Sequence, residues 1–250
     1  VFVTLFLVMM GYISYFNVVK SKDFISSPYN RRSDTLAKRV TRGKILDKKG
    51  KVLAQTTTSA DGSETREYPY GREFAHVVGY TAKGKYGLES RMNSELLSSN
   101  AFFLEKLTNE FQDKKNPGDN VVTTLDVKLQ RAAYDALGDR KGAVVAMDPK
   151  AGKVLAMVSK PDFNPETVED KWQTLNTDSS ARLLNRATQG LYPPGSTFKI
   201  LTTLAFIRQQ PVAYKTFDFT CNSQLTVDDV TINCYNGNAH GEENLEGAFT

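Results

Sequence analysis

The sequence predicts an α+β protein with a membrane-spanning helix at its N-terminal end. Three observations lead to this prediction: an uncharged apolar run at residues 1–19, a short strand followed by a helix at 120–137, and two apolar segments around a turn at 149–152. Strand, helix and hairpin in this order indicate an α+β or mixed three-layer domain. A chain of 250 residues can form one large domain or two modest ones.

Composition excludes several classes of protein. Charged residues make up 24% of the chain, and 32 Lys+Arg against 28 Asp+Glu give a net charge of only +4. This balance is neither that of a disordered chain nor that expected for binding a phosphate backbone, so we expect no nucleic-acid partner. Two His and two Cys are too few for a zinc finger or a four-cysteine cluster, and we expect no metal and no cofactor.

The apolar run at residues 1–19 contains no charged residue. As a helix it would span roughly 28 Å, close to the hydrocarbon thickness of a bilayer. A cleaved signal peptide is the alternative, but its apolar region is usually about 7–15 residues, and Ile13–Phe16 is too bulky for a cleavage site. We therefore predict a single-pass anchor. The basic residues that follow do not fix its orientation, because the positive-inside rule compares the number of Lys and Arg residues on the two sides of a membrane span.

Several elements are predicted between the anchor and a strong turn at Asn116-Pro117-Gly118-Asp119. We take this turn as a domain boundary, which divides the rest of the chain into residues 20–118 and 119–250. In chain order the predicted elements are a polar stalk at 20–40, a hairpin at 42–54, a loop at 56–67, a helix from 87 to about 97 and a second helix at 101–111.

The segment after the turn has clearer signals. A short strand at 120–125 precedes a helix at 126–137, whose apolar residues share one face and whose end is marked by Gly138. Residues 142–148 and 153–159 flank Pro149-Lys150-Ala151-Gly152 and predict a β-hairpin, apolar enough to lie centrally in a sheet.

The most informative motif is Ser196-x-x-Lys199, which follows Pro193-Pro194-Gly195. The prolines and the glycine break the chain, so we expect a largely buried helix from Thr197 to Ile207 with Ser196 at its N-terminus. Free backbone N–H groups point there and can stabilise an oxyanion. Three residues along a helix place Lys199 on the face of Ser196, where a lysine can act as the base that activates a serine.

The motif alone leaves two interpretations open. Ser-x-x-Lys is expected by chance about once in a chain of this composition, and a capping serine with a solvated lysine would give the same letters. Two features favour the nucleophile: residues 200–207 are too apolar for a surface helix, and Pro-Pro-Gly fixes the entry of the chain.

The motif and several other segments, in this order, resemble the penicillin-binding proteins. Pro194-Gly195-Ser196-Thr197-Phe198-Lys199 resembles their active-site motif, in which the serine is acylated and the lysine is its base. The further matching segments are RGKILDKKGKVLA at 42–54, Gly87-Leu88-Glu89, Val122 to Asp126 with Leu129-Gln130, GAVVAMDPKAGKVLAMVSKPDFN at 142–164 and Asn185-Arg186-Ala187.

The resemblance implies a monofunctional class B protein similar to the penicillin-binding protein A group. It implies an anchor at 1–19, a stalk and pedestal (dimerisation-type) domain at 20–118, and the first part of a mixed α/β, serine β-lactamase-like transpeptidase domain at 119–250. It also implies a D,D-transpeptidase that cross-links peptidoglycan stem peptides through an acyl-enzyme on Ser196 and is a target of β-lactams. The body would lie on the extracytoplasmic side of the cell membrane, beside a polytopic glycan polymerase.

The sequence departs from the family in one respect. Neither Ser-x-Asn nor Lys-Thr/Ser-Gly, the family's second and third motifs, occurs downstream of Ser196. We therefore expect the chain to be the N-terminal portion of a longer enzyme, inactive by itself. Two alternatives remain: a non-catalytic scaffold for the polymerase, and a β-lactam sensor or β-lactamase relative, although such relatives lack the segments at 42–54 and 87–89.

Other residues carry weaker signals. Cys221 and Cys234 are expected to pair as a disulfide in an oxidising compartment, worth roughly 3 kcal/mol, and the alternative is two reduced thiols. We interpret His240 as a packed or loop histidine and His76 as structural. Glu89 is interpreted as a pedestal packing or hydrogen-bonding residue, and Arg186 as a residue that orders the loop before the nucleophile.

Overall fold

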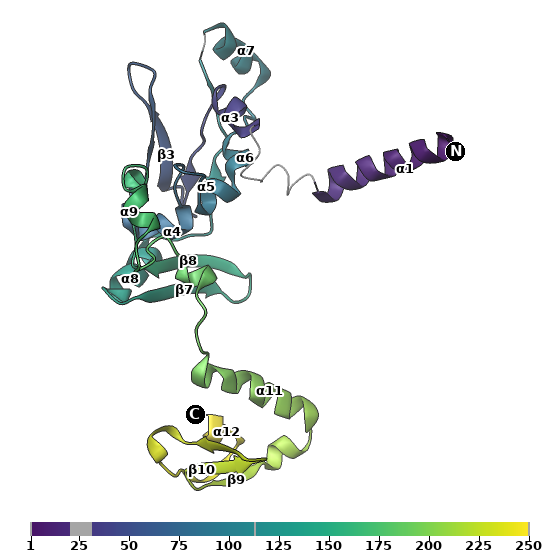
Figure 1. Ribbon diagram of the computed structural model, residues 1–250, viewed down its shortest axis with the longest axis vertical. Coiled ribbons are helices and arrows are strands. Elements are labelled where there is room, and N and C mark those ends of the chain that lie inside the picture. Colours follow the sequence, from purple (N-terminus) through teal and green to yellow (C-terminus); the bar gives the residue numbers. More distant parts are fainter. Residues whose placement is uncertain (1, 21–31, 113, 250) are drawn as a thin grey trace. The chain divides into compact units, whose positions relative to one another are not determined.

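The computed structural model describes residues 2–20, 32–112 and 114–249. The chain divides into two units, Val1–Gly190 and Leu191–Thr250, each containing helices and short antiparallel or parallel strand pairs (Figure 1). The predicted α+β fold class is therefore confirmed.

The N-terminal apolar run is helical. It forms α1 (Phe2–Tyr15) and a π-helical turn at Phe16–Lys20, and no residue of either is buried. Together they make a 19-residue helix, long and apolar enough to cross a membrane. This agrees with the predicted anchor.

The first unit contains a four-stranded sheet. Its strands are β2 (Ile45–Leu46), β3 (Val52–Thr58), β4 (Glu64–Glu67) and β6 (Val121–Val122), in the order β4-β3-β2-β6. The predicted hairpin at 42–54 is confirmed, since β2 and β3 pair antiparallel. The predicted loop at 56–67 is wrong: the β-branched residues at 56–58 extend β3, which pairs with β4 after a turn at Gly62, where φ is +84°.

The turn predicted at 116–119 also contains a strand. Asn116–Pro117 forms β5, which pairs in parallel with β1 (Val40–Thr41). Glycine is required beside it: a Cβ on Gly118 would collide with the backbone of Gly43 and Leu96, and one on Gly43 with the backbone of Asp119. These close approaches tie the segment at 116–119 to the sheet, and the domain boundary drawn there stays a prediction.

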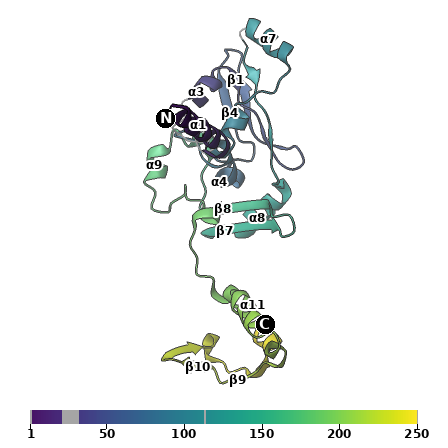
Figure 2. The ribbon, with the colours of Figure 1, turned by 90° about the vertical axis from the view of Figure 1, so that its right-hand side faces the viewer.

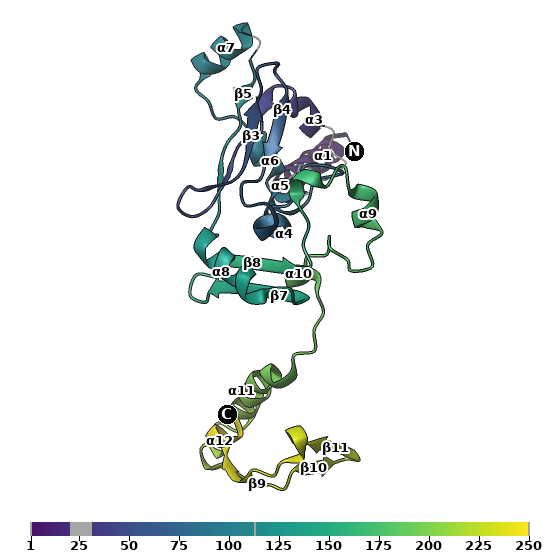
Figure 3. The same cartoon turned by 90° about the vertical axis from the view of Figure 1, so that its left-hand side faces the viewer.

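Short helices pack against this sheet, whereas α7 (Phe103–Phe111) extends away from it (Figure 3). The helix predicted from 87 to 97 is confirmed as two pieces separated by Met92, and the one predicted at 101–111 is confirmed as α7. Ile45, Leu53, Phe74 and Leu96 are fully or almost fully buried in the core between sheet and helices. The helices are α3 (Arg32–Ala37), a 3-10 turn at Gly71–Phe74, α4 (Ala75–Val78), α5 (Gly87–Arg91), α6 (Asn93–Leu96) and α7 (Phe103–Phe111).

A long hairpin packed against one helix follows in the first unit (Figure 2). β7 (Gly142–Asp148) pairs antiparallel with β8 (Lys153–Lys160), and α8 (Val127–Leu137) begins at Asp126, whose carboxylate accepts the N–H groups of Lys128 and Leu129. Buried Gln130 joins α8 to the hairpin through both the N–H and the carbonyl of Met157. The helix and the hairpin are confirmed, but in the described residues β7 and β8 pair only with each other, not within a larger sheet.

A second small core lies nearby in the same unit. It contains Ala75, Tyr80, Phe163 and Val168, with Trp172 packed against it. The elements in this part are a 3-10 turn at Pro165–Thr167, α9 (Trp172–Asn176) and α10 (Arg186–Gln189).

The second unit has several short elements and no buried residue among positions 191–249. The helix predicted from Thr197 to Ile207 is confirmed, but its burial is wrong: Ile200, Leu201 and Leu204 are each more than half exposed. The reason is that the unit covers only one side of the helix, where Phe206 and Ile207 are half-buried and Phe206 packs against Phe217. The elements are a 3-10 turn at Gly195–Phe198, α11 (Lys199–Gln209), 3-10 turns at Ala213–Thr216 and Tyr235–Gly237, β9 (Asp218–Cys221), β10 (Gln224–Val227), β11 (Val230–Asn233), β12 (Gly241–Asn244) and α12 (Leu245–Phe249).

Candidate functional site

Ser196 and Lys199 lie on one continuous helical turn. Gly195 has φ +56° and begins a 3-10 turn, and the N–H of Lys199 donates to the carbonyl of Ser196 as α11 begins. The hydroxyl of Thr197 stabilises the turn, because it donates a hydrogen bond to the carbonyl of Pro194 at 2.6 Å. Residues three apart are eclipsed in a 3-10 helix, so the two side chains project from the same face.

Both side chains are exposed, so reactants can reach them from solvent. The continuous helical segment begins at Gly195, and the partial positive charge at its N-terminal end suits a developing oxyanion. A hydroxyl and an amine on one face of a helix N-terminus can together carry out nucleophilic attack on a carbonyl.

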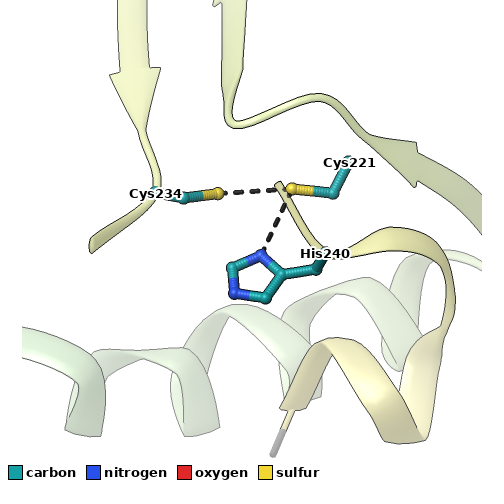
Figure 4. A group of neighbouring side chains, drawn as sticks. All are labelled: Cys221, Cys234 and His240. Atoms are coloured by element: carbon teal, nitrogen blue, oxygen red, sulfur yellow. Dashed lines mark hydrogen bonds between the residues drawn. The ribbon is translucent and has the colours of Figure 1, made fainter. Parts of the chain in front are cut away.

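Three side chains of types that can bind a metal meet in the second unit (Figure 4). Cys221 ends β9, Cys234 follows β11, and His240 precedes β12. The sulfurs of the two cysteines are 3.3 Å apart, and Nδ1 of His240 is 3.4 Å from Sγ of Cys221. All three ligand atoms lie within 4.8 Å of one another.

Hydrogen bonding separates the acidities of the two thiols. The His240 side chain, together with backbone N–H groups of His240 and Ser223, lowers the pKa of Cys221 to about 6. The hydrogen bond with Cys221 raises the pKa of Cys234, whereas the charge of Lys199 lowers it. Cys221 is therefore the thiol whose anionic form is favoured.

The disulfide predicted between Cys221 and Cys234 stays a prediction. Both residues are free thiols in the structure, with their sulfurs close to each other. His240, interpreted from sequence as a packed or loop histidine, contacts one of them. Sequence analysis missed this three-residue group; the signal that could have found it is that one of only two histidines follows Cys234 by six residues.

A buried ion cluster lies in the first unit. Glu89 is completely buried, and its two carboxylate oxygens accept from Nε of Arg42 at 2.6 Å and Nε of Arg66 at 2.8 Å. Burial lowers the pKa of Arg42, while Glu89 opposes that change. Glu89 thus makes the hydrogen bonds expected from sequence. Its partner Arg66 was missed because β4, which carries it, was predicted as a loop.

Two further residues have structural contacts. Nε2 of buried His76 lies 2.8 Å from the carbonyl oxygen of Arg182, and burial lowers the pKa of His76. Arg186 is also buried, and its guanidinium donates to the carbonyls of Ser180 and Ala181. Arg186 therefore holds the loop that precedes α10.

Two family models match the chain. Residues 142–250 match the family described as penicillin binding protein transpeptidase domain, and residues 42–121 match the penicillin binding protein A dimerisation domain. The Ser196-x-x-Lys199 turn lies inside the first match, and Arg42, Arg66 and Glu89 lie inside the second.

The curated proteins with similar sequences are much longer than the region that they share with this chain. The peptidoglycan D,D-transpeptidase PbpA of Mycolicibacterium smegmatis is 37% identical over 177 residues, which are 64% of this chain and 36% of that protein. Stage V sporulation protein D of Bacillus subtilis is 30% identical over 79% of this chain and 32% of its own length. The chain thus spans about a third of the length of these relatives.

Solved structures show the same fold. Penicillin-binding protein A from M. tuberculosis, as an imipenem acyl-enzyme complex, is 30% identical with a TM-score of 0.73, covering 84% of this chain and 52% of that chain. The D,D-transpeptidase domain of a peptidoglycan glycosyltransferase from Eggerthella lenta is 35% identical with a TM-score of 0.71, covering 84% and 47%.

Proposed function

Because the chain belongs to the class B penicillin-binding proteins, we propose that it carries the nucleophile of a peptidoglycan D,D-transpeptidase. In this proposal Ser196 is the residue acylated by the donor stem peptide, and Lys199 is its base. The observation that carries the proposal is their placement on one face of the helical turn that begins α11, within the segment matched to the transpeptidase family.

The first half of the reaction forms an ester. Nζ of Lys199 takes the proton of the Ser196 hydroxyl, and the oxygen attacks the carbonyl carbon of the penultimate D-Ala of a stem peptide. Backbone N–H groups at the start of the Gly195–Phe198 turn are suited to stabilise the oxyanion of the tetrahedral intermediate. The C–N bond then breaks, and the terminal D-Ala leaves as an amine that takes up the proton.

The second half transfers the acyl group. An amine of a neighbouring stem peptide attacks the ester carbonyl, and the amide forms as the C–O bond to Ser196 breaks. The proton lost by the amine passes through Lys199 to the Ser196 oxygen. A β-lactam would enter the same first step, because its strained amide also presents a carbonyl to Ser196. Its C–N bond opens without releasing a separate leaving group, so the acyl-enzyme persists.

The remaining parts of the chain have roles consistent with this activity. We propose residues 1–19 as the membrane anchor, 20–118 as stalk and pedestal, and 119–250 as the first part of the catalytic domain. The body would lie on the extracytoplasmic side of the cell membrane, where the stem peptides are. A polytopic glycan polymerase is the proposed membrane partner, because a monofunctional cross-linking enzyme needs a supply of nascent glycan strands.

The names of the relatives support the reaction. Those aligned with this chain include peptidoglycan D,D-transpeptidases of Mycolicibacterium smegmatis and Escherichia coli. The M. tuberculosis relative has been solved as acyl-enzyme complexes with imipenem and penicillin G. The chain aligns with part of each of these proteins, so we assign the activity to the full-length protein that contains it.

Labelling with a fluorescent penicillin tests the assignment. In membranes holding the full-length protein, Ser196→Ala should abolish covalent labelling, and Lys199→Ala should slow it by about 100-fold or more, as expected for loss of a general base. Ser59→Ala and Lys215→Ala are matched controls, since both residues are exposed, and they should label at the wild-type rate.

The outcomes separate the alternatives. Labelling retained by Ser196→Ala would overturn the nucleophile assignment, and a normal labelling rate in Lys199→Ala would overturn the base. A wild-type protein that takes up no label would favour the scaffold interpretation. Rapid release of the label by hydrolysis would favour a β-lactamase relative.

A further inference from the structure

We propose that Cys221, Cys234 and His240 bind a zinc ion through the two cysteine sulfurs and Nδ1 of the histidine. This site uses neither Ser196 nor Lys199 as a ligand, and its test does not depend on the transpeptidase assignment. The three side chains come from three segments that the backbone brings together, as Figure 4 shows.

Backbone pairing holds the three segments in place. Cys221 is opposite Gly241 in the antiparallel pair formed by β9 and β12, so His240 is adjacent to Cys221 across that pair. The N–H of Cys234 donates to the carbonyl of Ser223 at 2.8 Å, which ties the end of the β10–β11 hairpin to its start. The ligands are therefore positioned by the fold and not only by proximity in sequence.

The distances suit a tetrahedral zinc ion. Zinc bonds of about 2.3 Å to sulfur and about 2.0–2.1 Å to nitrogen place two sulfurs about 3.8 Å apart, and a sulfur and a nitrogen about 3.6 Å apart. The corresponding separations here are 3.3 Å between the sulfurs and 3.4 Å between Sγ of Cys221 and Nδ1 of His240. To bind an ion, these two pairs of atoms need to separate by only a few tenths of an ångström, and the third pair, Sγ of Cys234 and Nδ1 of His240, already lies within 4.8 Å.

The surroundings of Cys221 suit a thiolate ligand. Its sulfur accepts hydrogen bonds from the backbone N–H groups of His240 and of Ser223, a turn residue with φ +73°. Such outer-shell donors orient a ligand and stabilise its negative charge. Two thiolates and a neutral imidazole would balance the charge of Zn²⁺, with Nε2 of His240 carrying the ring proton.

A bound metal would also stabilise this unit. No residue between 191 and 249 is buried, so the unit has little apolar packing to hold its strands. Small folds with weak cores are commonly held by a metal or a disulfide. A disulfide would use only the two cysteines, whereas zinc also accounts for the His240 nitrogen directed at Cys221. Three protein ligands leave a fourth position, reachable from solvent because His240 is exposed.

Metal analysis of the full-length protein, purified under reducing conditions, tests the proposal. We expect one zinc per chain, removal by a chelator, and restoration by added Zn²⁺. Cobalt substituted for zinc should give sulfur-to-cobalt charge-transfer and tetrahedral d–d absorption bands. Cys221→Ser, Cys234→Ser and His240→Gln should each weaken zinc binding by about tenfold or more.

Two further variants distinguish the loss of a zinc ligand from a general loss of folding. Glu242→Gln, in the exposed residue of β12 two positions after His240, should retain zinc and serves as the control. Cys234→His should also retain zinc, because it replaces one ligand with another, but its cobalt form should lose part of the charge-transfer absorption. Absence of stoichiometric zinc, undiminished binding in the serine variants, or isolation of the native protein with an intact Cys221–Cys234 disulfide would each overturn the proposal.

Discussion

The units Val1–Gly190 and Leu191–Thr250 differ in how their side chains are used. The first buries apolar residues in two clusters and also encloses a carboxylate between two guanidinium groups. In the second, every described residue is at least partly exposed, including three apolar residues on α11. Burial of apolar surface is the main favourable contribution to folding, so the first unit should dominate the free energy of unfolding of this chain.

The contrast bears on function. The motif proposed to carry the nucleophile lies in the unit that has no buried residue among positions 191–249, whereas the buried ion cluster lies in the segment of the first unit that matches the dimerisation domain. In the second unit, the described order comes from backbone strand pairing and helix hydrogen bonds. Substitutions can therefore test the comparison by their effect on stability.

The largest expected effect is that of Glu89→Gln. Removing the carboxylate charge leaves the buried guanidinium groups of Arg42 and Arg66 without a counter-ion, which should lower the free energy of unfolding by about 3–5 kcal/mol. Denaturant unfolding, followed by circular dichroism, measures this change.

Glu110→Gln is the control for that experiment, because Glu110 is an exposed carboxylate on α7, and it should change the free energy by less than about 0.5 kcal/mol. Equal effects of the two substitutions would mean that the cluster does not stabilise the first unit, and the comparison would lose its main support.

A pair of leucines compares the two units directly. Leu96 is fully buried in the first unit, whereas Leu204 on α11 is 52% exposed. In the 250-residue chain, Leu96→Ala should cost about 2–5 kcal/mol because it opens a cavity in the core. Leu204→Ala should cost less than about 0.5 kcal/mol. A large loss in Leu204→Ala, measured by the same unfolding experiment, would show that α11 is packed in solution.

Local signals explain which parts of the fold could be predicted from sequence. The helix at 127–137 and the hairpin at 142–160 were predicted because Asp126, Gly138 and the Pro149–Gly152 turn mark their ends in the sequence itself. The strand β4 was missed because Glu64–Glu67 is polar, and its pairing with β3 depends on backbone hydrogen bonds that composition does not reveal.

The sites differ in the same way. Ser196 and Lys199 could be predicted because three residues along one helix fix their relation. The Cys221–Cys234–His240 group could not, because its members are up to 19 residues apart and meet only through strand pairing. Burial of α11 was wrongly inferred because an apolar sequence predicts burial only where another layer covers it.

The smallest expected effect is a pH dependence of the first unit through His76. Burial lowers the pKa of this histidine below its unfolded value of about 6.5, so the unfolded chain binds the proton more readily. The contribution of His76 is therefore complete above about pH 6.5 and is lost as the pH falls from there through the folded pKa. Each unit of separation between the two pKa values corresponds to about 1.4 kcal/mol.

His76→Gln should show a flatter dependence of the free energy of unfolding on pH between about 7.5 and 5 than the wild type. Parallel curves for the two proteins would mean that protonation of His76 is not coupled to unfolding, even though its ring lies against the carbonyl of Arg182.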